Sequence, residues 1–384
     1  MKTALVIGGG PAGCAAAHQL GMLGGWDVLI VEASSQIGGG VRTLTMGGHP
    51  YTLGPRHFLT EKPYLYEFLS QYVPMRSCAE HEFRTYVERD DAFYNFPICE
   101  EDIAGMPDAD AIALERAQAP GPEGATNLEE YWIQSVGRTL FKKFIDDYNK
   151  KMWFVDSVKE MDTFNWSPKG PPITSKKNKV FSDKISAYPI KANGYDDYFP
   201  IATAEAKVLL NTKVENYDLP KKTVVINGEK RSFDVIINTL APDMVLNYVH
   251  GELPFIGRKF YPFILPVEFA LPKDVYFLYY AGPGAVTRVV EYKKLTRYES
   301  PNTLLGLEVP TLENRLYPVP TKATMALSDK YFEMMPDGVY SAGRAGVYRY
   351  GSIDFDKCID HAMNIAKDLK GGGGGSGSAI ELGD

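Results

Sequence analysis

The first forty residues carry the hydrophobic pattern of a parallel-sheet unit. Residues 3–7 form a short apolar run of the kind that becomes a buried parallel strand. An alanine-rich stretch follows and predicts a helix, and residues 28–31 then form a second apolar run that predicts the next strand. The order strand, helix, strand predicts that the chain opens with an α/β domain of the Rossmann type.

Helical patterns return twice after this unit. Residues 64–72 predict a helix, and residues 100–155 have a largely helical pattern broken by one loop. Asn127 is a candidate N-cap within the second region, because Glu130 stands three residues later in the capping-box position. The second region therefore predicts an inserted helical subdomain.

Strand patterns account for most of the remaining chain. Alternation of apolar and polar residues with many aromatic side chains predicts an antiparallel sheet in the region after residue 252. A last helix is expected to begin near Asp354. The predicted strands are 82–88, 92–97, 209–214, 224–227, 233–242, 255–268, 275–281, 288–295, 303–308 and 338–342, of which 209–242 and 338–342 are expected to return to the Rossmann-type domain.

Two segments do not fit a regular element. Residues 166–180 are rich in proline and lysine, which excludes a regular helix or a central strand and predicts a mobile loop. Residues 371–384 form a Gly/Ser-rich tail that we expect to be flexible and exclude from the fold.

Three glycines follow the first strand at the G-x-G-x-x-G spacing. Gly8 would form the tight turn, Gly10 would let the backbone approach a pyrophosphate, and Gly13 would let the helix pack close to the strand. Ala12 belongs to the same predicted cofactor-binding turn, where free N–H groups at the helix start face the phosphates. Glu32, after the second strand, can accept hydrogen bonds from ribose hydroxyls. The ordered set predicts dinucleotide binding, whereas the glycines alone would be weak evidence, because a glycine-rich turn without a ligand is the alternative explanation.

Composition excludes several classes of protein. The net charge of −7 argues against a nucleic-acid-binding surface, which is usually basic. No stretch has the eighteen or more apolar residues that span a bilayer, and we expect no membrane association. The four cysteines form no C-x-x-C pair, which favours a reduced cytoplasmic protein without a metal site.

The residues after Glu32 distinguish FAD from NAD by resemblance. Gly39, Gly40 and Arg42 resemble the second glycine motif of the glutathione-reductase and amine-oxidase type of flavoproteins. That resemblance implies FAD as the cofactor.

A second resemblance covers most of the chain. The segments NLEEYWIQSVGRTLFKKFIDDYNKKMWFVDSVKEM, FSDKISAYPIKANGY, TRVVEYKK, LYPVP and AGRAGVYRYGSIDFDKCIDHA occur in the order and rough spacing of UDP-galactopyranose mutases. The chain resembles this family of flavoenzymes, which interconvert pyranose and furanose forms of a nucleotide sugar such as UDP-galactose. The resemblance implies an isomerase in which reduced FAD forms an N5-sugar adduct. The implied partner is the nucleotide-sugar substrate, and a homodimer is one alternative for the oligomeric state, which the sequence leaves open.

The resemblance also implies roles for individual residues. Arg288 would grip the diphosphate with its planar guanidinium, and Tyr317 and Tyr350 would assist it, which makes these three the candidate catalytic residues. The further candidates for substrate binding are Asn95, Phe144, Tyr148, Trp153 and Tyr188. For Phe144, Tyr148 and Trp153, an aromatic stripe in the core is the alternative explanation.

The flavin would contact a second group of residues. The helix that begins near Asp354 would direct the positive end of its dipole at the flavin and favour the anionic reduced state. The candidate cofactor-binding residues implied in addition to the glycine motifs are Arg56, His57, Val214, Arg344, Gly351, Ser352 and Ile353.

Three positions depart from the family pattern. Pro172 stands where a second diphosphate arginine is expected, Leu59 replaces a histidine near the flavin, and Leu316 replaces the first tyrosine of a pair. These changes put UDP-galactose itself in doubt as the substrate. Two rival functions stay open, an FAD-dependent oxidoreductase of the amine-oxidase or phytoene-desaturase type and a flavin-binding protein without catalysis.

The predicted fold is therefore an α/β, Rossmann-type FAD-binding domain with an inserted helical subdomain and an antiparallel β-sheet subdomain. The expected domains are 1–63, 196–252 and 336–370 for the FAD-binding domain, 98–165 for the helical nucleotide-binding subdomain, 64–97, 166–195 and 253–335 for the sheet subdomain, and 371–384 for the tail.

Overall fold

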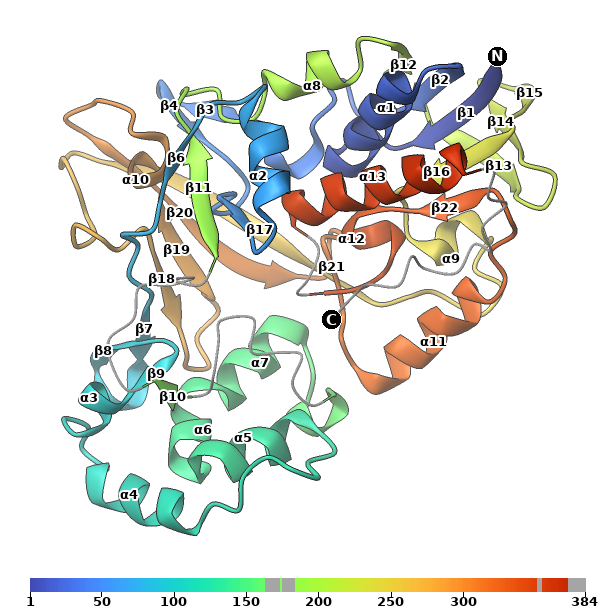
Figure 1. Cartoon of the computed structure of the whole chain (residues 1–384). Coiled ribbons are helices and arrows are strands. Elements are labelled where there is room, and N and C mark those ends of the chain that lie inside the picture. The colour runs from blue at the N-terminus through green and yellow to red at the C-terminus, as the bar shows by residue number, and fades with distance from the viewer. Residues whose placement is uncertain (163–172, 175–183, 351–353, 372–384) are drawn as a thin grey trace.

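A computed structural model describes residues 1–162, 173–174, 184–350 and 354–371 (Figure 1). Most of the predicted loop 166–180 and the tail from residue 372 lie outside the described residues, as do Gly351, Ser352, Ile353 and Pro172. Ile173 and Thr174 form a short strand, β10, which pairs in parallel with β9 (Ile98–Cys99).

A five-stranded parallel sheet forms the Rossmann-type domain, in the order β12-β2-β1-β16-β22. Alternate residues of β1 face opposite sides, because side chains along a strand alternate. Ala4 and Val6 pack with the helices α1 and α13, whereas Leu5 and Ile7 pack with the elements on the other face. The strands are β1 (Lys2–Ile7), β2 (Trp26–Val31), β12 (Ala206–Leu209), β16 (Val235–Asn238) and β22 (Val339–Ser341), and the helices are α1 (Pro11–Leu23) and α13 (Phe355–Lys370).

A small antiparallel sheet and two helices cover the second face. The predicted strand 224–227 belongs to this small sheet, in the order β13-β14-β15, and does not join the parallel sheet. Its buried Val224 and Ile226 pack with Leu5 and Ile7 in one cluster. The covering elements are β13 (Val214–Asp218), β14 (Thr223–Ile226), β15 (Glu229–Ser232), α9 (Pro242–Val245) and α11 (Lys322–Phe332).

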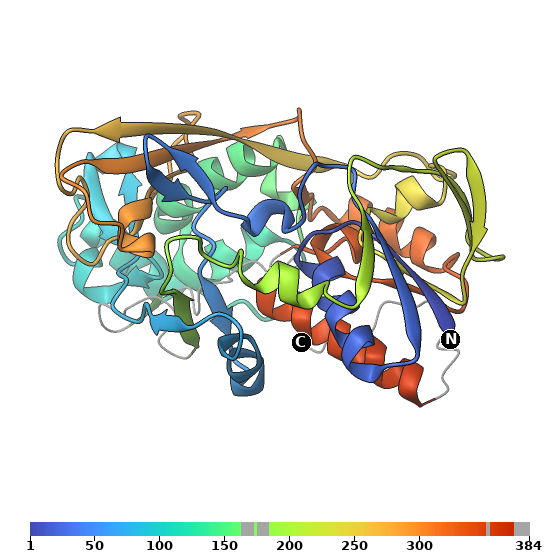
Figure 2. The ribbon, with the colours of Figure 1, turned by 90° about the horizontal axis from the view of Figure 1, so that it is seen from above.

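A seven-stranded sheet forms the second body of the molecule, in the order β21-β17-β20-β19-β18-β7-β8. Its core is antiparallel as predicted, but β18 pairs in parallel with β7, which comes from a distant part of the chain and is not constrained by a hairpin. Figure 2 shows the long strands β17 and β20 running side by side toward the Rossmann-type domain. The strands are β7 (Arg84–Val87), β8 (Ala92–Asn95), β17 (Phe255–Leu265), β18 (Phe277–Tyr280), β19 (Arg288–Glu291), β20 (Thr303–Thr311) and β21 (Tyr317–Pro318).

Three predicted strands differ clearly from the structure. Residues 210–213, inside the predicted strand 209–214, connect β12 to β13, and the strand predicted over 233–242 ends at Asn238. The prediction of a strand over residues 288–295 is wrong after Glu291, because Tyr292–Thr296 forms the helix α10. The Nζ of Lys294 donates to the carbonyl of Leu271 at 2.8 Å, and the Nζ of Lys293 donates to that of Glu268 at 2.9 Å. These side chains hold the turn against a loop, which the apolar pattern of the segment does not reveal.

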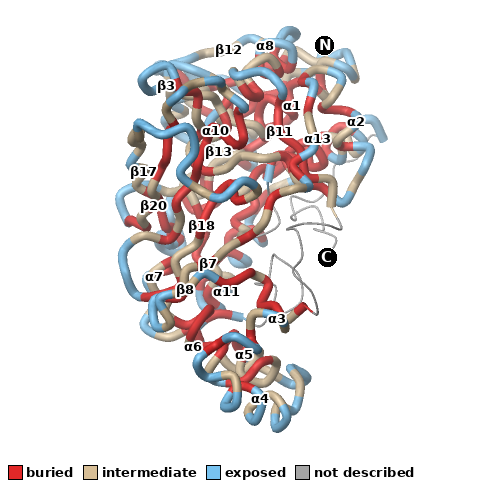
Figure 3. The backbone as a smooth tube through the Cα atoms, turned by 90° about the vertical axis from the view of Figure 1, so that its left-hand side faces the viewer, coloured by how far each residue is buried: buried red, intermediate tan, exposed pale blue. Residues whose placement is uncertain are grey.

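The predicted helical insert is present and follows β9. Asn127 caps α5, with its Oδ1 accepting from the Glu130 N–H at 3.0 Å, while the Glu130 carboxylate reaches Thr126. A buried ion pair between Lys143 and Asp90 joins the insert to the large sheet. Figure 3 shows the outlying helix α4 as largely exposed. The helices are α3 (Glu100–Ile103), α4 (Ala109–Gln118), α5 (Leu128–Val136), α6 (Arg138–Phe144) and α7 (Asp146–Trp153).

Short elements connect these bodies. The predicted helix 64–72 is α2 and the strands of the connection form two small sheets, β5-β11-β6 and β3-β4. The elements are β3 (Leu44–Met46), β4 (His49–Tyr51), β5 (Phe58–Thr60), α2 (Pro63–Ser70), β6 (Met75–Ser77), β11 (Ile185–Pro189), α8 (Tyr198–Ala202) and α12 (Gly343–Gly346), with short 3-10 turns at Gly39–Val41, Glu88–Asp90 and Val158–Glu160.

Candidate functional site

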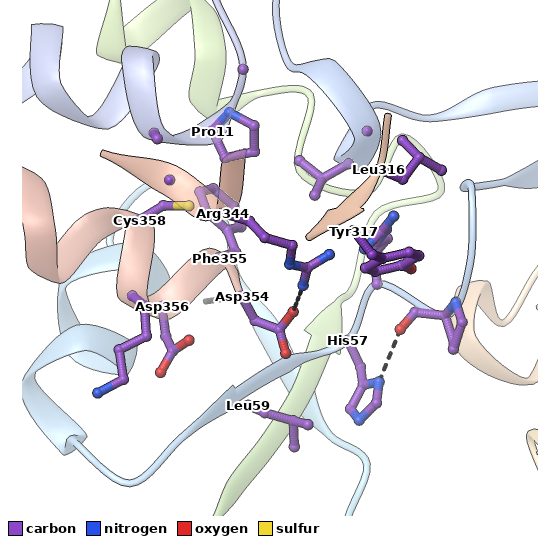
Figure 4. Close-up of a pocket in the computed structure, with 18 of the residues that line it drawn as sticks. Pro11, His57, Leu59, Leu316, Tyr317, Arg344, Asp354, Phe355, Asp356 and Cys358 are labelled. Carbon is purple, nitrogen blue, oxygen red and sulfur yellow. Dashed lines mark hydrogen bonds and ion pairs between the residues drawn. The ribbon is translucent and has the colours of Figure 1, made fainter. Parts of the chain in front are cut away.

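A cavity of about 580 Å³ lies where the Rossmann-type domain meets the inner face of the seven-stranded sheet. Figure 4 shows Arg344 and Tyr317 directed into the same space, with Pro11 at the start of α1 on another side. The sequence-predicted residues that line this cavity are Gly10, Ala12, Gly40, Arg56, His57, Arg288, Tyr317, Arg344 and Tyr350.

The glycines at the start of α1 have the geometry that the motif predicts. Gly8 has a φ of +99°, and a Cβ on Gly13 would lie 1.9 Å from the carbonyl oxygen of Gly8. By contrast, a Cβ on Gly10 would meet no atom within 4 Å, so this glycine borders open space on the cavity. Gly8 and Gly13 are therefore required by the fold, while Gly10 leaves room for a ligand beside the helix N-terminus.

The second glycine pair lies against this turn. A Cβ on Gly39 would lie 3.1 Å from the Cα of Gly10. Glu32 accepts from the Gly9 N–H at 2.7 Å and from the Ser34 N–H at 2.7 Å, and so fixes the loop between the two glycine motifs. The open space at Gly10, the helix N-terminus beside it and the cavity of about 580 Å³ that they border fit a dinucleotide.

Arg288 is held by the sheet on which it stands. Its Nε and Nη2 donate to the two carboxylate oxygens of Glu308 at 3.0 and 2.7 Å, and its Nη1 donates to the Tyr279 hydroxyl at 2.9 Å. Burial acts to lower the pKa of Arg288, but the Glu308 carboxylate outweighs it and the pKa is raised. The guanidinium therefore stays charged, and its two remaining N–H groups can donate to a ligand.

Tyr317 lies among arginines. The guanidinium carbons of Arg344 and Arg258 are 4.9 and 5.1 Å from the centre of its ring. Burial acts to raise the pKa of Tyr317, but the positive charges of Arg56, Arg344 and Arg258 outweigh it and the pKa lies below the usual value. Its hydroxyl is therefore a stronger hydrogen-bond donor to an anion than an ordinary phenol.

Tyr350 completes this wall of the cavity. Its ring meets Tyr317 edge-on with the centroids 5.7 Å apart, and it meets Trp153 edge-on with the centroids 4.5 Å apart. Burial raises the pKa of Tyr350, so its hydroxyl keeps its proton at neutral pH.

The predicted aromatic residues of the insert do not share one position. Phe144 and Trp153 are buried in the core that joins the insert to the sheet, which is the alternative that the sequence left open. Tyr148 packs on the edge of that core with its ring 5.8 Å from that of Tyr279. Their predicted contact with a nucleobase stays a prediction.

Other predicted site residues lie away from the cavity lining. Asn95 is buried and donates its side-chain amide to Asp102 at 2.7 Å. Tyr188 is buried in the core between the small sheet and the large one. Val214 is the first residue of β13, in the small antiparallel sheet. Arg42 directly follows the 3-10 turn Gly39–Val41. Their predicted roles are not supported by a position on the cavity.

Sequence reasoning missed the residues that hold Arg288 and Tyr317 in place. Arg258 on β17 is 4% exposed, and Glu308 on β20 is 1% exposed. Strand alternation could have placed Arg258 on the same face as the apolar Ile256 and Phe260. The pairing of Glu308 with Arg288 depends on the register of β19 and β20, which no local pattern gives.

Two of the three departures from the family pattern line the cavity. Leu59 and Leu316 present apolar side chains there, as Figure 4 shows. The N-terminus of α13 forms the opposite wall, where Arg344 donates to Asp354 at 2.6 Å. The third departure, Pro172, is outside the described residues.

Three further features of the described residues concern metal binding, thiols and membranes. Within the described ranges, no group of three or more His, Cys, Asp or Glu side chains could hold a metal ion. Cys14, Cys78, Cys99 and Cys358 are free and buried. In the part of the chain that the structure describes, every helix is too short or too polar to cross a membrane.

Comparison with known proteins adds family evidence to this geometry. The family model for UDP-galactopyranose mutase matches residues 143–350, and the model for an NAD(P)-binding Rossmann-like domain matches residues 6–72. A solved structure of reduced UDP-galactopyranose mutase is similar at 16% identity and a TM-score of 0.84, covering 97% of this chain and 96% of that one.

Two oxidoreductases share the fold more distantly. An oxidoreductase from Methanosarcina mazei is 14% identical with a TM-score of 0.62, covering 95% of this chain and 100% of that one. Putrescine oxidase bound to putrescine is 14% identical with a TM-score of 0.59, covering 96% of this chain and 99% of that one. At these identities the likeness is one of fold.

The parallel sheet, the glycine turn and the matched Rossmann-like region define a protein with a dinucleotide-binding domain of the Rossmann type. Beyond this class, the matched family model spans more than half of the 384 residues. The chain belongs to the UDP-galactopyranose mutase family.

Proposed function

We propose that the protein is an FAD-dependent isomerase that interconverts the pyranose and furanose forms of a nucleotide sugar. The observation that carries the proposal is that the open glycine cradle and the cluster of Arg288, Tyr317 and Tyr350 border one cavity. A cofactor at the cradle and a diphosphate at the cluster would therefore meet in the same space. UDP-galactose is the family's substrate and the first candidate.

One group of cavity residues would hold the cofactor. Gly10, Gly40 and the N–H groups at the start of α1 would hold the FAD, with the first turn of α13 on the other side of the cavity. When bound and reduced, FAD would supply at N5 the nucleophile for the anomeric carbon of the sugar.

The protein itself would control the leaving diphosphate. Arg288 keeps two N–H groups for phosphate oxygens, and the Tyr317 hydroxyl adds a donor beside it. By holding the diphosphate near the carbon that it has left, these groups favour its return after the ring has closed in its new form.

The test is turnover of a panel of UDP-, GDP- and dTDP-linked pyranoses and furanoses by the purified protein, with and without dithionite, followed by chromatography. Ring isomers formed only after reduction are the expected result. If no donor is isomerised, and an amine or apolar substrate bleaches the flavin under anaerobic conditions, the protein is an oxidoreductase instead.

A further inference from the structure

The arginines on the cavity differ in how their charge is balanced. Of the four described arginines that line it, three have a carboxylate partner. Arg288 pairs with Glu308 at 2.7 Å, Arg315 pairs with Asp243 at 2.7 Å, and Arg344 pairs with Asp354 at 2.6 Å. The negative charge of each carboxylate largely offsets the positive charge of its guanidinium partner, so none of these three arginines by itself attracts an anion strongly.

Arg56 is the exception among these four. Within the described parts of the chain, its guanidinium has no carboxylate in ion-pair contact. Its Nε is buried without a hydrogen-bond partner, as are the Nε atoms of Arg315 and Arg344. A buried donor without a partner is costly, and a charged one more so, unless a ligand completes it.

The backbone around Arg56 is fixed from two sides. The hydroxyl of the buried Tyr195 donates to the carbonyl of Arg56 at 2.8 Å, and the His57 ring lies 3.1 Å from the carbonyl of Pro55 through its Nδ1. Figure 4 shows the second of these contacts as a dashed line. The side chain of Arg56 therefore projects from an anchored loop.

The direction of that side chain is given by its glycine neighbours. A Cβ on Gly54 would lie 3.3 Å from the Nη2 of Arg288, 3.5 Å from the Oε1 of Glu308 and 3.9 Å from the Nε of Arg56. A Cβ on Gly40 would lie 3.7 Å from the Nη2 of Arg56. Arg56 thus begins beside Arg288 and ends near the second glycine motif, between the two walls of the cavity.

We propose that Arg56 is the principal diphosphate-binding residue of the nucleotide-sugar site, with Arg288 and Tyr317 as its neighbours. A diphosphate placed on Arg288 alone would meet a guanidinium that is already hydrogen-bonded to Glu308, whereas Arg56 has no ion-pair partner among the described residues and offers a planar fork of donors. The lowered pKa of Tyr317 agrees with this, because Arg56 is the largest of the positive charges that depress it. The proposal rests on the proposed function and differs from the cofactor role that the sequence suggests for Arg56.

The test uses the flavin-containing protein as purified and measures binding without turnover. UDP, GDP and dTDP are titrated by calorimetry into the wild type, Arg56→Gln and Arg56→Lys. Arg231→Gln on the exposed hairpin strand β15 is the matched control, since it removes the same charge far from the cavity. Loss of a charged hydrogen bond is expected to weaken diphosphate binding about 10- to 100-fold in Arg56→Gln, with partial recovery in Arg56→Lys.

The flavin content of each variant separates the explanations. Unchanged flavin content with weakened diphosphate binding supports the proposal. Loss of flavin from Arg56→Gln, or diphosphate binding equal to that of the wild type, overturns it. If none of the three diphosphates binds to the wild type, the proposed function itself fails, which is a different result from an Arg56 variant that binds normally. Thermal unfolding of Arg56→Lys verifies that the loop stays folded.

Discussion

Arg288 and Glu308 stand directly opposite each other on the neighbouring strands β19 and β20, joined by two hydrogen bonds of 3.0 and 2.7 Å. The Glu308 side chain is 2% exposed, so its charge is balanced by Arg288 and not by water. A residue proposed to act on the substrate is therefore also part of the core of the sheet.

Removing Arg288 should for this reason affect both folding and turnover. Arg288→Ala leaves the Glu308 carboxylate buried without its partner, which typically costs about 3 kcal/mol of unfolding free energy. We expect turnover to fall by at least about tenfold as well, as for other losses of a charged stabiliser. Urea unfolding and the isomerase assay measure the two effects.

A double variant separates them. Arg288→Met combined with Glu308→Leu removes both charges, and should recover most of the stability while turnover stays low. An unchanged urea midpoint in Arg288→Ala would show that the pair does not contribute to the stability of the sheet.

Two buried groups on α13 should shift stability with pH in opposite directions. Burial, assisted by Asp354, raises the pKa of Asp356 to about 6. The unfolded chain loses this proton near pH 4 while the folded chain keeps it, so stability falls as the pH rises from about 4 to 6, by about 3 kcal/mol in total. Asp356→Asn should remove this loss and raise stability at pH 7 more than at pH 4.

His361 produces the reverse dependence. Burial lowers its pKa to about 4, and among the described residues neither ring nitrogen has a hydrogen-bond partner. The unfolded chain takes up this proton below about pH 6.5 and the folded chain does not, so stability falls by about 3 kcal/mol as the pH drops to 4. His361→Leu should remove this loss.

In the wild type, the stability that Asp356 removes as the pH rises from 4 to 6.5 is nearly balanced by the stability that His361 restores. We expect urea unfolding, measured at steps of half a pH unit, to show a free energy of unfolding that falls in acid for Asp356→Asn. For His361→Leu the free energy of unfolding should instead rise in acid. Parallel curves for all three proteins would contradict the assignment of these groups.

The glycine turn gives a sharper test of cofactor binding. Gly10→Ala adds a methyl group where the structure has open space, so the thermal midpoint of the flavin-free protein should hardly change. Flavin retention should nevertheless fall by at least about tenfold, because the methyl group occupies the path of the pyrophosphate. Gly13→Ala, whose Cβ would lie 1.9 Å from a carbonyl oxygen, should instead prevent correct folding. If the Gly10→Ala protein purifies with a full complement of flavin, the proposed role of Gly10 in cofactor binding is wrong.

The sequence was most informative where a local pattern decides the structure. The first βαβ unit, the capped helix after Asn127 and the core strands of the large sheet depend on periodicity, glycine geometry and caps, all of which are local. The helix α10 was missed because tertiary contacts of Lys293 and Lys294 override the strand pattern.

The site was less predictable than the fold. Arg288, Tyr317 and Tyr350 do meet at the cavity, but the partner Glu308 depends on strand register. Phe144 and Trp153 have a spacing that fits a base-binding face and a core equally well, and only the packing of the insert places them in the core.

Three parts of the cavity lining are held by different elements of the fold. The cradle belongs to α1, Arg288 is fixed by the sheet, and the segment from Gly54 to Leu59 is anchored through Tyr195. With Arg56 in the role proposed above, substitutions confined to this last segment would change the preferred anion and leave the glycine turn at Gly10 unaltered.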